Sequence, residues 1–214
     1  MRDYRGVGAK SLGRRDRRKQ ATRRQLILAG RKLFSSVGLY EARIEDLAED
    51  AGIAKGTLYL YFRNRDELAC EVVTIGYREL QASVTDRICE VGTLPMLVRR
   101  IVEAHFAFFA ENPDLQRILH QARGMLKFDR PEWRRLRAPL REHIAFLAEA
   151  LALAPSPLRR RRAARWSLAI ELFGSVSGVA SVRTALGTRG AYREVERALA
   201  GNLARLPGAR SSRS

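Results

Sequence analysis

Apolar residues recur at intervals of three and four along almost the whole chain, and this spacing is the feature that most restricts the fold. Leu26, Ile27, Leu33 and Phe34 share one face of a helix, and comparable spacing continues to residue 206. No segment alternates apolar and polar residues with the period of two expected of a half-buried strand. The sequence therefore predicts an all-α protein.

Glycine, proline and capping residues divide this pattern into separate helices. Gly38 and Gly52 stand where the first two helices should stop, and Asn64 is the expected N-cap of a longer one, with Glu67 as its capping-box partner. Pro139 falls inside a helical pattern and is expected to kink it. The first four predicted helices span residues 19–37, 44–51, 54–62 and 65 to beyond 91.

The pattern also predicts how the chain is divided. We expect a basic arm at 1–16, a DNA-binding helix-turn-helix domain at 17–65, a larger helical domain at 66–206 and a disordered tail at 207–214. The long fourth helix joins the two domains.

Charge points to a polyanionic partner. The chain carries a net charge of +17, and residues 1–32 hold twelve basic residues against Asp3 and Asp16. A charge this large and this concentrated favours nucleic acid, although an arginine-rich solvated surface is the alternative interpretation.

The sequence gives little support for a membrane partner, an exported protein or a metal site. No apolar stretch approaches the roughly 20 residues that span a bilayer, and no secretory signal is evident, so we expect a cytoplasmic, nucleoid-associated protein without a membrane partner. The histidines are too dispersed for a metal cluster, and Cys70 and Cys89 lie too far apart on one predicted helix to form a disulfide. We predict neither a metal nor a cofactor.

Residues 44–62 have the layout of a helix-turn-helix motif, in which the second helix enters the major groove of DNA. When Leu58 and Phe62 are assigned to the core, the remaining residues form an outer surface. Its side chains carry an ammonium group and hydroxyls, and together with exposed backbone N–H groups these can bind phosphate. A helical hairpin inside an all-α core is the alternative. The predicted contact residues are Lys55, Gly56, Thr57, Tyr59 and Tyr61.

The stretch RIEDLAEDAGIAKGTLYLYFRNRDEL resembles the DNA-binding signature of the tetracycline-repressor (TetR) family of bacterial regulators, over about residues 20–70. The resemblance implies that Arg65 replaces the family's phosphate-binding lysine. Two positions depart from the family pattern: Arg43 stands where threonine or serine usually caps the second helix, and Ala54 where serine opens the recognition helix. We include both in the predicted DNA-binding surface, because Arg43 can pair with a phosphate in place of a cap.

The family resemblance also implies a homodimer. In the family the last two long helices form a four-helix interface, which would correspond to residues 159–187 and 191–206. Small residues at helical spacing favour close approach there, namely Gly174, Ser177, Gly178 and Ser181. An internal core helix is the alternative. A dimer would present two recognition helices about one DNA turn apart, roughly 34 Å, and so bind a near-palindromic double-stranded operator.

The larger domain is expected, from the same resemblance, to bind a small effector. Aromatic and histidine side chains could line an apolar pocket with a few polar groups, although most of them are expected to be core. His120 and Arg123 lie one helical turn apart and could hold an anionic head group, which suggests a lipophile such as an acyl compound. The candidate ligand-binding residues are His105, Phe109, His120, Arg123, Trp133 and Trp166.

The leading hypothesis is a ligand-responsive, dimeric transcriptional repressor that a small lipophilic effector releases from DNA. The alternative is a non-specific, nucleoid-type DNA-binding protein without an effector. An enzyme is not supported, because the sequence has no Gly-rich phosphate loop, metal-ligand cluster or GxSxG nucleophile motif. We therefore predict no catalytic residues.

Overall fold

The computed structural model describes residues 13–50, 52–88, 92–127, 131–187, 197, 198 and 201. Its described part is all-helical, as predicted. None of the described helices is long and apolar enough to cross a membrane. The helices are α1 (Arg14–Val37), α2 (Ile44–Asp50), α3 (Lys55–Tyr59), α4 (Arg65–Arg87), α5 (Leu94–Glu111), α6 (Pro113–Met125), α7 (Arg137–Ala150) and α8 (Arg162–Ala185), with 3-10 helices η1 (Pro131–Leu136) and η2 (Pro157–Arg160).

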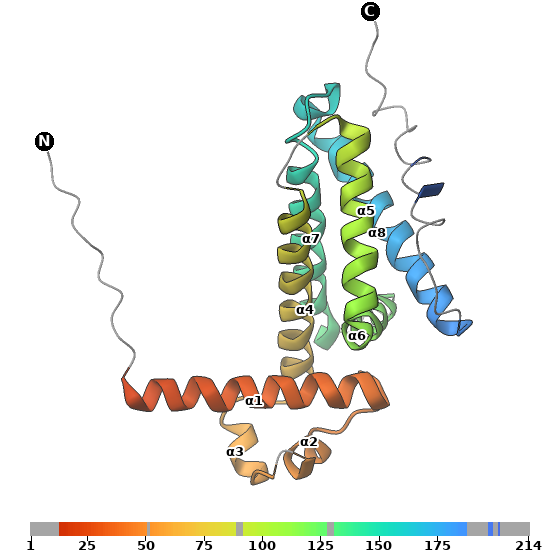
Figure 1. Cartoon of the computed structure of the whole chain (residues 1–214). Helices are drawn as coiled ribbons and strands as arrows, with labels where there is room; N and C mark the ends of the chain where they lie inside the picture. Colours follow the sequence, from red (N-terminus) through yellow and green to blue (C-terminus); the bar gives the residue numbers. More distant parts are fainter. Residues whose placement is uncertain are drawn as a thin grey trace, which may run out of the picture.

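Helix α1 lies across one end of the molecule, with α2 and α3 on its outer side and the remaining helices rising from its other side (Figure 1). Helix α4 begins beside α3 and continues into the upper bundle, where it packs on α5, α6 and α7. The buried side chains form one continuous cluster from α1 to α8. The small end formed by α1, α2 and α3 and the larger bundle therefore share a core instead of being joined only by a linker.

Helix α1 begins earlier than predicted. It starts at Arg14, so the last residues of the predicted arm at 1–16 are helical, and the rest of that arm lies largely outside the described residues. The segment RRDRRKQ consists mainly of residues with good helix propensity, which extend the helix beyond its apolar face.

The predicted glycine stops are confirmed. Gly38 closes α1 with a φ of 102°, and Gly52 follows α2 with a φ of 63°, both in the region that L side chains rarely adopt. The tight turn after α2 brings Ile53 back so that its N–H bonds the carbonyl of Ala48. This turn orients α3 against α2.

The predicted capping residue of α4 is also confirmed. The Asn64 side chain accepts a hydrogen bond from the Glu67 N–H at 2.9 Å. The Glu67 carboxylate, however, accepts from the N–H of Arg63 at 2.8 Å, one residue before the N-cap position expected for a capping box. The start of the long helix is thus fixed from both directions.

Other boundaries differ from the predictions. Helix α4 ends at Arg87 and not beyond residue 91, and Cys89 lies outside the described residues. Pro139 does not kink a helix, because it lies in the first turn of α7, where proline is tolerated. Helix α8 falls within the predicted 159–187, whereas most of the predicted helix at 191–206 and the tail at 207–214 lie outside the described residues.

Candidate nucleic-acid interface and effector site

The helix-turn-helix unit is held by a small apolar core. Leu47 of α2 and Leu58 of α3 are almost completely buried, together with Phe62 just after α3. The Arg23 guanidinium lies 5.2 Å above the Phe62 ring and bonds Glu71 of α4 at 2.8 Å. A helix of five residues cannot be stable alone, so these contacts fix its orientation.

The outer face of α3 is open. Ala54, Lys55 and Gly56 are exposed, and the Tyr59 side chain is about half exposed at 47%. Leu60 is 79% exposed, and the sequence analysis did not select it. The alanine at the helix start, Ala54, gives the first turn of α3 no side-chain cap. This surface can approach a phosphate backbone closely.

Glu45 of α2 organises the edge of that surface. Its carboxylate accepts a hydrogen bond from the Tyr59 hydroxyl at 3.2 Å and lies 4.0 Å from the Arg43 guanidinium. Its own backbone N–H lowers the pKa of Glu45, and Tyr59, Arg43 and Lys55 lower the pKa further. The ionised carboxylate therefore orients Tyr59 and neighbours two cations that a phosphate could also bind.

Three of the predicted DNA-binding residues are less open. Thr57 is partly buried, and Tyr61 is partly buried and packs against the core. The Arg65 guanidinium bonds the Asp66 carboxylate at 2.8 and 3.0 Å and the backbone carbonyl of Tyr40 at 2.7 Å. Arg65 thus ties the start of α4 to the loop between α1 and α2, a structural role that the sequence did not indicate.

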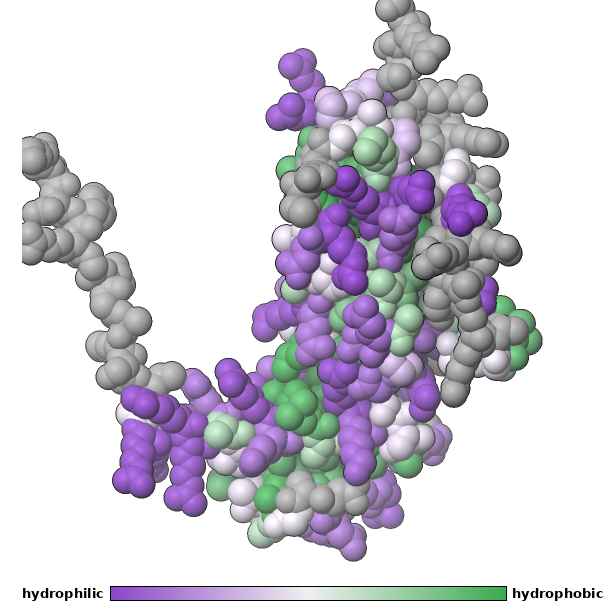
Figure 2. All heavy atoms as spheres, in the orientation of Figure 1, coloured by the Kyte–Doolittle hydropathy of each residue, from purple (hydrophilic) through white to green (hydrophobic). Residues whose placement is uncertain are grey.

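The N-terminal part of α1 adds a second basic surface. Arg14, Arg15, Arg18 and Lys19 are all exposed. Figure 2 shows their end of the helix as a group of hydrophilic side chains projecting beyond the body of the protein. These charges are carried on a helix and not on an unstructured arm.

The six predicted ligand-binding residues do not form one site. His105 and Phe109 are buried in the core, whereas His120 is exposed and its Nδ1 lies 2.6 Å from the Ser181 hydroxyl of α8. Trp133 lines a cavity of about 680 Å³ between the α1–α2 loop and the C-terminal end of α6. Of the six, Arg123 and Trp166 line a common groove, between α7 and α8.

This α7–α8 groove consists of two hollows of about 380 and 880 Å³ that share Arg141 and Trp166. Apolar side chains make its floor, and Arg123 and Arg137 stand beside the smaller hollow. An apolar floor with guanidinium groups around it suits an amphiphile with an anionic end. The residues of the smaller hollow are Arg123, Arg137, Leu140, Arg141, Ile144, Trp166, Ile170, Phe173 and Gly174.

A pair of buried histidines lies next to this groove. The Nε2 atoms of His105 and His143 are 3.2 Å apart, and the His143 ring packs edge-on against Phe173 with centroids 4.7 Å apart. Burial lowers the pKa of His105 to about 4 and lowers the pKa of His143 well below its usual value. The sequence analysis did not select His143, because it lies 38 residues from its partner.

We expect this pair to make stability depend on pH. Both histidines are neutral when folded, but each titrates near 6.5 when unfolded, so the unfolded state binds more protons below that pH. Lowering the pH to 5 should therefore reduce the free energy of unfolding by about 2 kcal/mol from His105 alone, in urea melts. His105→Leu should flatten the profile relative to His120→Gln, and a parent profile already flat from pH 7.5 to 5 would contradict the assignment.

Helix α6 contacts α1 and the α1–α2 loop with one face and α8 with the other. On the first face Asp114 bonds Arg31, Arg117 bonds the carbonyl of Ser35, and Gln121 accepts from the N–H of Leu39 at 2.8 Å. On the second face the partners are Gln116 with Thr184, His120 with Ser181 and Arg123 with Ser177. Motion of α8 can therefore reach α1 through one rigid helix.

The four predicted interface residues of α8 separate into two sets. Ser177 is buried and Ser181 partly buried, and both bond α6. Gly174 and Gly178 are exposed, and no described atom would lie within 4 Å of a Cβ added to either. They belong to an outward stripe with apolar neighbours, the α8 stripe, made of Ile170, Gly174, Gly178, Val182 and Leu186.

These features describe a helical chain in which a helix-turn-helix unit is attached to a larger bundle. Residues 26–72 match the model of the family described as bacterial regulatory proteins, tetR family. The matched residues contain α2, α3 and the start of α4, so the helix-turn-helix unit of this chain is similar to that of the TetR family.

Known proteins resemble the chain in sequence or in fold. The chain is 24% identical over 91 residues to the fatty acid metabolism regulator protein of Bacillus subtilis, an alignment that spans 42% of this chain and about half (47%) of that protein. Its fold is similar to transcriptional regulator FadR from B. subtilis in complex with stearoyl-CoA, with a TM-score of 0.70, 17% identity and coverage of 85% and 97% of the two chains. For the fatty acid degradation regulator FadR from Bacillus halodurans the TM-score is 0.69, with 16% identity over 93% of this chain and 100% of that one.

Proposed function

We propose that this protein is a dimeric transcriptional repressor that binds a near-palindromic operator and is released from it by an acyl thioester. The observation that carries the proposal is the two-faced contact of α6, which connects the helix-turn-helix unit to the groove-bearing helices. A ligand that changes the position of α8 would change the position of α1 and with it the spacing of two recognition helices.

The effector class is supported by the groove and by one relative. The α7–α8 groove combines an apolar floor with arginines, and the similar FadR structure from B. subtilis contains stearoyl-CoA, which has a long apolar chain and phosphates. Guanidinium groups bind phosphate oxygens in bidentate geometry. The chain's Arg137 and Arg141 would hold the anionic part while Trp166 and Ile144 contact the apolar part.

The dimer is supported by the α8 stripe. An exposed apolar stripe with two glycines permits two helices to approach closely, and a two-fold axis would bring the same stripe of a second subunit against it. Such a dimer would hold its recognition helices on one side of the DNA.

The test is operator binding with and without saturated acyl-CoA of about 12 to 18 carbons. An operator is first selected in vitro from random DNA, and its affinity is measured by fluorescence anisotropy at fixed salt. A coupling free energy of about 1 to 3 kcal/mol predicts roughly a 5- to 150-fold loss of operator affinity when acyl-CoA is bound. Arg141→Ala should weaken the effect, whereas Arg160→Ala, on an exposed arginine of η2, should not.

The same measurement addresses the alternative of a non-specific DNA-binding protein. Specific regulators bind their operators typically about 10³ to 10⁷ times more tightly than other DNA. A ratio near one, with no acyl-CoA effect, would favour the non-specific protein and exclude the repressor.

We also predict that the basic end of α1 contributes affinity that is independent of sequence. Arg14→Ala with Arg18→Ala should weaken binding to operator and random DNA alike, because both side chains are exposed and can reach flanking phosphates. The log–log salt slope should fall by up to about 1.8, since each phosphate that the protein neutralises adds about 0.9 to the slope. Arg159→Ala with Arg160→Ala removes the same charge elsewhere and should leave the slope unchanged; equal slopes in all three proteins would refute the prediction.

A further inference from the structure

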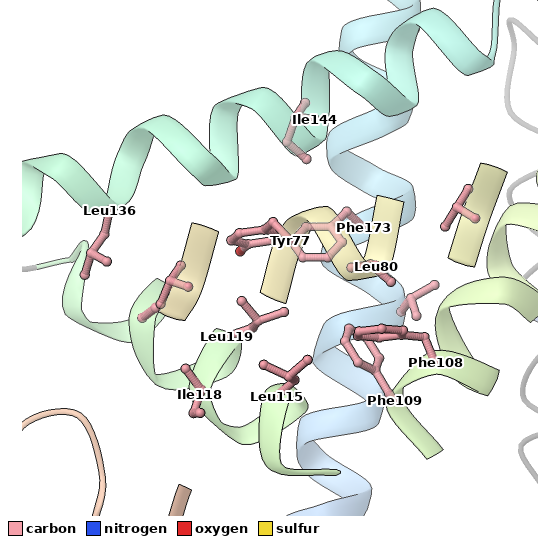
Figure 3. Close-up of a cluster of buried hydrophobic side chains, with 14 of the residues drawn as sticks. Tyr77, Leu80, Phe108, Phe109, Leu115, Ile118, Leu119, Leu136, Ile144 and Phe173 are labelled. Carbon is pink, nitrogen blue, oxygen red and sulfur yellow. The ribbon is translucent and has the colours of Figure 1, made fainter. Parts of the chain in front are cut away.

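Three buried polar atoms without a hydrogen-bond partner among the described residues surround one aromatic ring in the core of the bundle. They are the Tyr77 hydroxyl of α4, His143 Nδ1 of α7 and Arg123 Nε of α6. The rings of Tyr77 and His143 lie 6.0 and 4.7 Å from the Phe173 ring, and the Arg123 guanidinium lies 5.3 Å from it. Figure 3 shows Tyr77 and Phe173 lying close together within the apolar cluster.

The hydrogen bonds of the histidine pair determine what His143 can still bind. His105 Nδ1 lies 2.7 Å from the carbonyl oxygen of Ile101, which can only accept, so Nδ1 carries the proton of the neutral ring. His105 Nε2 is then an acceptor, and His143 Nε2 must donate to it across 3.2 Å. His143 Nδ1 is therefore left as a bare acceptor.

Tyr77, in contrast, offers a hydrogen-bond donor without an acceptor. Its hydroxyl belongs to a residue that is 2% exposed, and its proton meets no acceptor in the described part of the chain. Burial raises the pKa of Tyr77, so the hydroxyl keeps that proton. A core normally satisfies such groups, so two unsatisfied groups in one place mark a position where a further polar group can bind.

The unpartnered atoms lie directly behind the α7–α8 groove. Phe173, Ile144 and Arg123 line its smaller hollow, of about 380 Å³, and the rings of Tyr77 and His143 both pack against Phe173. A ligand chain in that hollow would contact Phe173, whose ring packs against both of them. The Tyr77 and His143 ring centroids are 5.3 Å apart, so one segment of a ligand can address both.

We infer that Tyr77 and His143 select an effector that carries a hydroxyl group on its apolar chain. A hydroxyl oxygen can accept the Tyr77 proton and donate its own to His143 Nδ1, which a plain hydrocarbon chain cannot do. The inference rests on the proposed function, and it narrows the effector from acyl thioesters in general to hydroxyacyl thioesters.

The first test compares binding of matched ligands by calorimetry. Dodecanoyl-CoA is compared with the same thioester carrying one hydroxyl, placed in separate compounds near the thioester, at mid-chain and at the chain end. The parent should bind at least one hydroxylated compound about 10-fold more tightly than the plain chain. Tyr77→Phe and His143→Phe should each lose that preference while keeping the affinity for dodecanoyl-CoA; equal affinities of the parent for all compounds would overturn the inference.

The second test needs no ligand. If the Tyr77 hydroxyl is unpartnered in the free protein, Tyr77→Phe should leave the thermal midpoint unchanged or raise it. A fall of about 2 to 4 °C would show that the hydroxyl bonds a structural partner such as a buried water, and would also overturn the inference. Tyr40→Phe, which removes the hydroxyl of an exposed tyrosine, is the matched control.

The two failures can be told apart. If the parent binds neither plain nor hydroxylated acyl thioesters, the proposed effector class is wrong. The thermal midpoint of Tyr77→Phe then tests whether Tyr77 and His143 form a ligand site. A fall in the midpoint rejects that site, and an unchanged or raised midpoint supports it.

Discussion

Gly56→Glu is expected to abolish operator binding while leaving the protein folded. Gly56 is exposed on α3, and no described atom would lie within 4 Å of an added Cβ, so the larger side chain has space in the free protein. On DNA the same side chain would place a carboxylate against phosphates or base edges. Like charges brought together at an interface cost several kcal/mol, so operator affinity should fall by roughly 100-fold or more.

Two variants serve as controls for this experiment. Gly56→Ala removes a poor helix former and should raise the free energy of unfolding by up to about 1 kcal/mol, with operator affinity changed only a few-fold. Ala110→Glu adds the same charge at an exposed position at the end of α5, far from α3 in sequence, and should bind the operator as the parent does. Full operator affinity of a folded Gly56→Glu protein would place the DNA-binding surface elsewhere.

Gly178→Leu is expected to separate the dimer into folded monomers. The position is open within one subunit, so leucine should not disturb the fold, but in a two-fold interface the added side chain occurs twice. Overpacking costs about 1 to 3 kcal/mol at each site, which corresponds to a roughly 30-fold or greater increase in the dimer dissociation constant. Analytical ultracentrifugation measures this constant, and operator affinity should fall with it.

The matched control is Gly124→Leu on α6, where an added Cβ would also meet no described atom within 4 Å. This variant should associate as the parent does. If Gly178→Leu remains as tight a dimer as Gly124→Leu, the subunits associate through a surface other than the α8 stripe.

The fold could be predicted largely from local signals. Helical periodicity, the glycine stops at Gly38 and Gly52 and the Asn64 cap act over a few residues, so they can be recognised without tertiary structure. The errors occurred where tertiary context decides. The sequence could not show that Pro139 falls in a first turn, because the preceding residues form a 3-10 helix instead of extending α7.

The candidate DNA-binding surface could be predicted only in part. Lys55, Gly56 and Tyr59 are open because the burial of Leu58 fixes the opposite face of α3, and helical periodicity reports that directly. The contacts of Arg65 depend on the Tyr40 carbonyl, 25 residues earlier, which periodicity cannot locate. Whether Arg65 also binds a phosphate stays a prediction.

The interior of the bundle was the least predictable part. His120 and Arg123 are one turn apart, as the sequence indicated, but α8 supplies serines that bond both of them. The pairing of His105 with His143 joins two helices that the sequence separates by 38 residues. Such pairs depend on the angle and position at which two helices cross. These cannot be deduced from the periodicity of a single sequence.

The contacts of α6 have a consequence for the evolution and engineering of such regulators. The bonds to Arg31, Ser35 and Leu39 use residues on the opposite face of α6 from the bonds to α8, so effector preference and DNA preference can diverge by separate substitutions. Exchange of whole DNA-binding units between relatives is more restricted. A chimaera that receives a foreign α1–α3 unit should bind the operator of that unit, but its response to effector should weaken unless an arginine remains at position 31 for Asp114, because Arg117 and Gln121 bond backbone groups that any such unit supplies.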